Sequence, residues 1–104
     1  MRPDPKLTPT ASADVAVAVA RYDGLKPAMG AEFLAELERV MAQIRAAPQA
    51  STLVDPPIRR ALLKEFPFGV FFVEGAAGAA DVVLAVLDLR QDPDVIRGMY
   101  QRRP

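Results

Sequence analysis

Apolar residues change their spacing halfway along this 104-residue chain. Up to about residue 46 they recur every three or four positions, as on one face of a helix. Between residues 58 and 89 they alternate or run together in β-branched and aromatic stretches, as strands do. This order of patterns predicts helices first and a sheet afterwards, which is an α+β arrangement within one domain spanning residues 1–104.

Two helices are predicted in the first half. Thr8 followed by Pro9 is typical of an N-cap with proline at the first helical position. The valines of residues 13–22 alternate, which favours a strand, but the start signal and the alanines between them favour a helix that ends at Asp23-Gly24. The second helix ends before Pro48 and has an apolar stripe and an opposite, solvated side. The stripe is Phe33, Leu34, Leu37, Val40, Met41 and Ile44, and the solvated side is Glu32, Glu36, Arg39 and Gln43.

The second half predicts three consecutive strands, over residues 58–66, 68–73 and 81–89, after a loop at residues 50–57. Their short links favour an antiparallel meander. Pro3 and Pro5 leave residues 1–6 poorly structured, or at most a short edge strand at Lys6 and Leu7. The expected fold is an N-terminal helical hairpin packed on a three- to four-stranded antiparallel sheet, followed by a short C-terminal helix to about Arg102.

The predicted sheet is apolar on both faces. In the last strand, Val82, Leu84 and Val86 face one way while Val83, Ala85, Leu87 and Leu89 face the other. One helical hairpin covers only one face of a sheet. Two explanations are open for the second face. Loops and the tail helix cover it, or a partner chain does, because large exposed apolar patches mark binding sites.

The composition excludes most enzyme templates. The chain has no Cys and no His, so it lacks a thiolate nucleophile, a disulfide framework, the commonest metal ligands and the usual general base of hydrolases. We expect no metal and no cofactor. The 13 basic and 13 acidic residues balance, so any contact with nucleic acid needs a local patch. The longest clean apolar run, residues 82–87, is far too short to span a membrane, and we expect a soluble cytoplasmic protein.

Several strings of the sequence resemble one known family. Residues 30–37 (Gly-Ala-Glu-Phe-Leu-Ala-Glu-Leu), followed by Ile44 and Pro48, resemble the second helix of the RelE/ParE toxin superfamily. Residues 59–72, with their Phe-Pro-Phe at 66–68, resemble its central hairpin, and the last strand followed by Arg90, Asp92 and Pro93 resembles its final turn. The resemblance runs from about residue 7 to the end of the chain.

The resemblance implies the toxin of a bacterial type II toxin–antitoxin pair, bound in a hetero-oligomer by a small, ParD-like antitoxin. The ParE-like branch poisons DNA gyrase by binding, whereas the RelE-like branch is a metal-independent endonuclease that cuts messenger RNA on the ribosome. The Phe-Pro-Phe string and the turn favour the ParE-like branch. Asp88 and Gln91 depart from the His-x-x-Arg pattern that this branch often has, which leaves a degenerate, non-toxic binding module as a further alternative.

Cleavage of RNA without histidine needs Arg or Lys to stabilise charge on phosphorus, together with an acid and a base. The candidates for a nuclease site are Arg60, Lys64, Arg90 and Tyr100, with Arg59 beside them. Arg60 and Lys64 share parity on one predicted strand and so point to one face, roughly 13 Å apart. The alternative is that these are solvated edge charges and that Tyr100 packs its ring against the sheet.

The candidate antitoxin site is an apolar groove along Leu34, Leu37 and Met41, with Phe71 included from the adjoining strand. An amphipathic partner helix would lay its apolar face there. The alternative is that all four residues belong to the core.

The candidate target-binding site is the basic C-terminal end. Arg97, Arg102 and Arg103, with Arg90 and Tyr100, form a docking patch in this interpretation. The alternative is a solvated helix end, where arginine suits the helix dipole.

Overall fold

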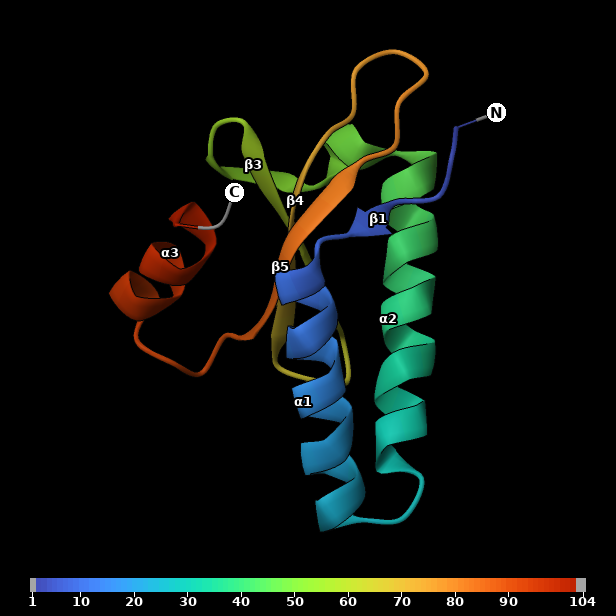
Figure 1. Cartoon of the computed structure of the whole chain (residues 1–104), viewed down its shortest axis with the longest axis vertical. Coiled ribbons are helices and arrows are strands. Elements are labelled where there is room, and N and C mark those ends of the chain that lie inside the picture. The colour runs from blue at the N-terminus through green and yellow to red at the C-terminus, as the bar shows by residue number, and fades with distance from the viewer. Residues whose placement is uncertain (1, 103–104) are drawn as a thin grey trace.

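Two long helices precede a five-stranded sheet in this computed structural model, and a short helix follows it (Figure 1). The structure describes residues 2–102. The elements are β1 (Lys6–Leu7), α1 (Pro9–Leu25), α2 (Met29–Ala46), a 3₁₀ turn η1 (Pro48–Ala50), β2 (Thr52–Asp55), β3 (Ile58–Leu62), β4 (Phe68–Val73), β5 (Val82–Asp88) and α3 (Pro93–Gln101). The α+β fold with an N-terminal helical hairpin and a short C-terminal helix, as predicted, is therefore confirmed.

The hairpin of α1 and α2 is closed by local side chains. The Thr8 hydroxyl accepts a hydrogen bond from the Ala11 amide at 3.1 Å, which confirms the predicted N-cap. Helix α1 continues through Gly24 to Leu25, slightly beyond its predicted end. The Asp23 carboxylate accepts from the Gly30 amide at 2.8 Å and so ties the start of α2 to α1. A Cβ at Gly30 would lie 2.6 Å from the Val19 carbonyl oxygen, so only glycine permits this approach.

The sheet has the strand order β1-β5-β4-β3-β2 and is mixed. Strand β1 pairs in parallel with β5, placing Leu7 beside Val83, and the other neighbours are antiparallel. The prediction of three to four antiparallel strands is wrong in two respects. The edge strand at Lys6–Leu7 is parallel, and β2 forms within the predicted loop. Strand β2 was not predicted because it has only four residues before the Pro56-Pro57 turn, and these show no clear alternation of apolar and polar side chains.

The face of the sheet beneath the helical hairpin forms the larger core. Its centre is a cluster of aromatic rings in which Phe33 packs edge-on against Phe66 and Phe68, with centroids 5.3 and 4.9 Å away. Tyr22 contacts all three of these rings. Aromatic pairs at such distances contribute beyond the area they bury. Apolar side chains from the helices and the sheet extend the core, among them Leu37, Val40, Ile44, Val70, Phe72, Val83 and Val86.

The opposite face of the sheet packs against α3 (Figure 1). Phe71 of β4 stacks on Tyr100 of α3, with ring centroids 4.5 Å apart and planes at 16°. Ala85, Leu87 and Ile96 complete this smaller core. Of the two explanations for the apolar second face, coverage by the tail helix is confirmed here. Leu62 on β3 stays 52% exposed, so the cover is incomplete.

A buried carboxylate ends β3 earlier than predicted. Glu36 of α2 was expected on the solvated side, but it is only 3% exposed. It accepts hydrogen bonds from the backbone amides of Lys64 and Glu65 and pairs with Arg39 at 3.6 Å. The chain after Leu62 is therefore held in a turn, where Lys64 is exposed. The prediction that Arg60 and Lys64 lie on one strand is wrong for this reason.

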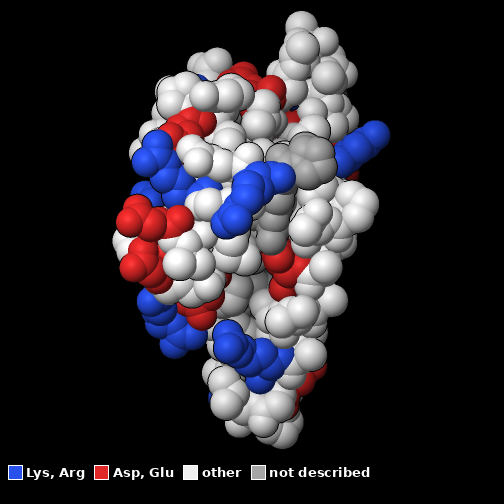
Figure 2. All heavy atoms as spheres, turned by 60° about the vertical axis from the view of Figure 1, so that its left-hand side comes forward, with Lys and Arg blue, Asp and Glu red and all other residues white. Residues whose placement is uncertain are grey.

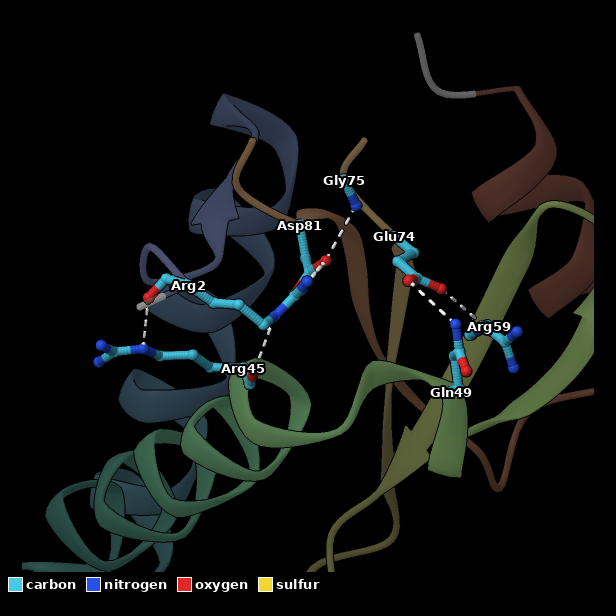
Figure 3. A network of polar contacts seen from close by, with 7 residues as sticks. All are labelled: Arg2, Arg45, Gln49, Arg59, Glu74, Gly75 and Asp81. Atoms are coloured by element: carbon cyan, nitrogen blue, oxygen red, sulfur yellow. Dashed lines mark hydrogen bonds and ion pairs between the residues drawn. The ribbon is translucent and has the colours of Figure 1, made fainter. Parts of the chain in front are cut away.

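The segment before β1 is held by a network of arginines and carboxylates (Figure 3). Arg2 donates to both oxygens of the fully buried Asp81 carboxylate at 2.6 Å, and Asp81 also accepts from the Gly75 amide. Arg2 and Arg45 donate to each other's backbone carbonyls at 2.8 and 2.7 Å. This network joins the segment before β1 to the end of α2 and to the β4–β5 loop.

Candidate functional site

A cavity of about 460 Å³ lies between α3 and the sheet, at strands β2, β3 and β4. We call it the α3 cavity. Strands β2, β3 and β4, the turn after β5 and helix α3 all contribute to its walls. The lining residues are Val54, Asp55, Arg60, Phe71, Leu89, Pro93, Asp94, Ile96, Arg97 and Tyr100.

Helix α3 is positioned by a cap and by its apolar side. The Asp92 side chain accepts from the Asp94 amide at 2.8 Å, and Pro93 occupies the first helical position. Ile96 and Tyr100, one turn apart, both point to the sheet and are buried. The helix therefore presents the Tyr100 hydroxyl to strand β2.

The Asp55 carboxylate accepts hydrogen bonds from two side chains of α3. The Tyr100 hydroxyl donates to the Asp55 carboxylate at 2.5 Å, and Arg97 donates to it twice, at 2.9 and 3.1 Å. The hydrogen bond from Tyr100, followed by that from Arg97, lowers the pKa of Asp55. Burial, followed by the hydrogen bond to Asp55, raises the pKa of Tyr100 to about 12. At neutral pH the tyrosine is therefore a protonated donor and the aspartate is a weak base.

Arg60 enters the same cavity from β3 and stands apart from this network. Its backbone pairs with Phe71 of β4, so its side chain lies on the α3 face of the sheet. Its Nε is buried and has no hydrogen-bond partner among residues 2–102. The neighbouring Arg59, on the other face, donates to the Ser51 carbonyl at 2.8 Å and lies 3.9 Å from Glu74 (Figure 3).

The other predicted nuclease residues lie outside the cavity. Arg90 is bound to Asp88 through Nη2 at 2.7 Å and Nε at 3.1 Å, and this hydrogen bonding is the main cause that lowers the pKa of Asp88. Lys64 is in the turn held by Glu36. The structure thus brings Arg60 and Tyr100 together and separates them from Lys64 and Arg90, so the predicted set of four is not assembled.

The predicted target-binding patch is likewise dispersed. Arg97 is engaged with Asp55, and the Nε of Arg102 donates to the Gly98 carbonyl of its own helix at 2.8 Å. Arg103 lies outside the described residues. Figure 2, which brings the α3 side forward, shows basic and acidic side chains interspersed over this face. The surface seen there has no broad field of one sign.

A second concavity, of about 400 Å³, lies where α1, α2 and the segment with β1 meet. We call it the hairpin groove. Leu34, Leu37 and Met41 of α2 line it, as predicted, opposite Leu7 and Val15. Leu34 is 38% exposed there, whereas Leu37 is buried. The rim carries charges of both signs, namely Asp4, Glu38 and Arg45.

Phe71 does not belong to the hairpin groove. It is buried under α3, on the opposite face of the sheet. Its inclusion with Leu34, Leu37 and Met41 is wrong because the alternation along this strand does not show which face of the sheet the helical hairpin covers. Phe71 is opposite Arg60 and Ala85 in the register, and both of these face α3.

Asp55 is the acceptor of the α3 cavity that the sequence did not reveal. It lies at the end of an unpredicted strand and meets its partner Tyr100 45 positions along the chain. Within the described chain, no three acidic side chains gather as a metal site. None of the helices at residues 2–102 is long and apolar enough to cross a bilayer.

The fold is shared with a chain of the chromosomal ParDE toxin–antitoxin system from P. aeruginosa. The two chains superpose with a TM-score of 0.71 at 17% sequence identity, over 83% of this chain and 95% of the other. The RelE/ParE-like fold expected from the sequence is therefore confirmed. No protein-family model matches the sequence, and the comparison with curated proteins gives no significant match.

Proposed function

We propose that this protein is the toxin of a type II toxin–antitoxin pair, that it acts by binding DNA gyrase, and that a ParD-like antitoxin neutralises it. The observation that carries the proposal is the fold, which matches nearly the whole length of a chain from a ParDE system. The sequence resemblance to the ParE-like branch supports the same conclusion. The proposal includes a cytoplasmic site of action, since the target is DNA gyrase.

The hairpin groove supports the antitoxin part of the proposal. It is an apolar concavity with an exposed leucine and charged residues of both signs on its rim. This is the surface that an amphipathic segment of a partner fits, with its apolar side chains in the groove and its charges at the rim. Leu34, Leu37 and Met41 are the proposed antitoxin contacts.

The α3 cavity favours gyrase binding over cleavage of messenger RNA. A nuclease without histidine needs a proton acceptor near its cationic groups. Tyr100 is protonated, with a pKa raised to about 12, and donates to Asp55. The pKa of Asp55 is lowered, so that carboxylate is a weak base. Arg60 lies in the cavity without Lys64 or Arg90.

Expression of the protein alone in bacteria tests the proposal. We expect growth arrest with filamentation and induction of a DNA-damage reporter, and we expect the purified protein to inhibit supercoiling by gyrase. Primer extension on translated messages should show no codon-linked cuts. Growth arrest with such cuts would establish the endonuclease alternative. Normal growth together with uninhibited supercoiling would contradict the toxin and leave the non-toxic binding module.

A second experiment tests the neutralisation, and it uses the product of a small open reading frame beside the gene. This product should bind the purified toxin and restore growth when both are expressed. A neighbouring protein that binds without restoring growth, or no binding by any neighbour, would contradict the proposed neutralisation.

A further inference from the structure

The Arg60 guanidinium is the unusual group of the α3 cavity. More than nine in ten buried polar groups in proteins find a hydrogen-bond partner, and a buried one without a partner costs free energy. The Nε of Arg60 is buried and has none in the described chain. Arg59, one position earlier in the same strand, has both a carbonyl and a carboxylate partner. Position 60 is therefore the unsatisfied one of the two.

One candidate for an internal partner of Arg60 already accepts hydrogen bonds from other residues. Asp55 lines the same cavity, but its oxygens accept from Tyr100 and twice from Arg97. Asp94 also lines the cavity, at the start of α3, and makes no ion pair with Arg60. The cavity thus contains a cation with an unused donor, and its volume is within the range of ligand pockets, roughly 300–1,000 Å³.

We propose that the α3 cavity binds one carboxylate side chain of a partner protein, which accepts a hydrogen bond from the Arg60 guanidinium while the residues next to it pack on the cavity's apolar wall. The planar fork of a guanidinium matches a carboxylate. The wall beside Arg60 is formed by Phe71, Leu89 and Ile96, which suits apolar neighbours of the carboxylate. The proposal goes beyond the toxin function and does not depend on it.

The charges around the cavity favour a single carboxylate over a nucleic acid chain. Binding of nucleic acid relies on several cations that neutralise successive phosphates. Here the carboxylates of Asp55 and Asp94 share the wall with Arg60, and Arg97 is paired with Asp55. A row of phosphates would bring several negative charges against these acidic groups, whereas one carboxylate brings a single charge.

Two blocked peptides test the proposal directly. Acetyl-Leu-Glu-Leu-amide is titrated into the isotope-labelled protein, and its Gln counterpart serves as the control. The readout is the resonance of the Arg60 Nε–H group, assigned by comparison with Arg60→Lys. We expect the Glu peptide to shift this resonance and to bind at least roughly tenfold more tightly than the Gln peptide, because a hydrogen bond between charged groups is lost with Gln. Equal binding, or no shift, would overturn the proposal.

Matched variants and two small anions complete the experiment. Arg60→Gln should abolish the preference for the Glu peptide, while Arg59→Gln should retain it. If Arg60→Gln fails to fold, the comparison of peptides on the unaltered protein still decides. Acetate is expected to bind at least roughly tenfold more weakly than the Glu peptide, because it lacks the apolar neighbours. Acetate as tight as the peptide, or inorganic phosphate tighter than it, would overturn the assignment to a carboxylate of a protein.

Discussion

The two faces of the sheet are covered in different ways. The hairpin face lies under two long helices and is filled by rings and aliphatic side chains from α1, α2, β4 and β5. The α3 face lies under one helix of nine residues, and polar groups share the space with a few apolar ones. Among residues 2–102, no buried side-chain nitrogen or oxygen on the hairpin face lacks a hydrogen-bond partner. On the α3 face, the Nε of Arg60 does. The first face has the larger core, and the second has a smaller core that borders the α3 cavity.

Removal of one aromatic ring from each face gives the largest expected effects. Phe33→Ala and Phe71→Ala both empty a buried site, but Phe33 packs against three other rings while Phe71 stacks on one and borders the α3 cavity. We expect Phe33→Ala to lower the free energy of unfolding by about 4 kcal/mol and Phe71→Ala by about 3 kcal/mol. Urea denaturation measures both.

If Phe71→Ala lowers the free energy of unfolding as much as Phe33→Ala does, or more, the hairpin face does not contribute more to stability than the α3 face. If Phe33→Ala fails to fold, the milder Phe33→Leu against Phe71→Leu provides the same comparison.

The next effect is expected at the buried carboxylate of the hairpin face. Glu36→Ala leaves the Lys64 and Glu65 amides without their acceptor, and hydrogen bonds to a charged group contribute about 1.5–3 kcal/mol each. We expect a loss of about 2 kcal/mol in the free energy of unfolding, because water replaces part of the interaction. Amide hydrogen exchange at residues 64 and 65 should also become faster. Glu32→Ala, at an exposed position of the same helix, is the control and should leave both measurements unchanged.

Tyr100 should make the stability of the α3 face depend on pH. Its pKa is raised to about 12, whereas an unfolded tyrosine ionises near pH 10. The folded state therefore retains the proton more strongly. The contribution of Tyr100 is complete below about pH 10 and is lost as the pH rises towards 12. At the acid end, the lowered pKa of Asp55 makes its contribution complete above about pH 4, and this is lost as the pH falls through the folded value.

Tyr100→Phe removes the alkaline effect and weakens the acid one, because Arg97 still donates to Asp55, and we expect a cost of about 1 kcal/mol at neutral pH. The chain has two tyrosines, so tyrosinate absorbance in Tyr22→Phe reports Tyr100 alone. A midpoint near pH 10 in that variant would contradict the hydrogen-bonded, buried hydroxyl. An unchanged acid limb of the stability curve in Tyr100→Phe would contradict its hydrogen bond to Asp55.

The hairpin face was largely predictable from the sequence, and the α3 face was not. Thr8, Pro9 and the stripe from Phe33 to Ile44 are local signals, and each element they predict is present. The α3 face depends on long-range pairs. Tyr100 meets Asp55 across 45 positions, and β2 is too short to show a period. Glu36 was misplaced for a related reason, since the turn that buries it lies 28 residues away.

The candidate site was predicted in part. Arg60 and Tyr100 were selected by residue type and do meet, but Arg90 was selected in the same way and is paired with Asp88 instead. Residue type indicates which groups can carry charge. Strand parity and the local turn decide which of them share a cavity, and a single sequence shows neither with certainty once a strand ends early, as β3 does at Leu62.

The smallest effect on stability, and the sharpest on partner binding, is expected at the hairpin groove. Leu34 is 38% exposed, so Leu34→Lys should change the free energy of unfolding by less than about 1 kcal/mol. A lysine there would place a charge in the apolar concavity and exclude a partner's apolar side chain. Val17→Lys is the control, because Val17 is 68% exposed on α1 and does not line the groove.

Co-expression with the antitoxin separates the two variants. We expect Leu34→Lys to stay toxic when the antitoxin is present and Val17→Lys to be neutralised, with affinities that differ by at least roughly tenfold in a binding titration. If the antitoxin neutralises Leu34→Lys as well, its contact lies elsewhere and the hairpin groove is not its site. If Phe71→Ala escapes neutralisation instead, the antitoxin acts at the α3 face. In that case the hairpin face would serve stability, and the α3 face would bind the partner.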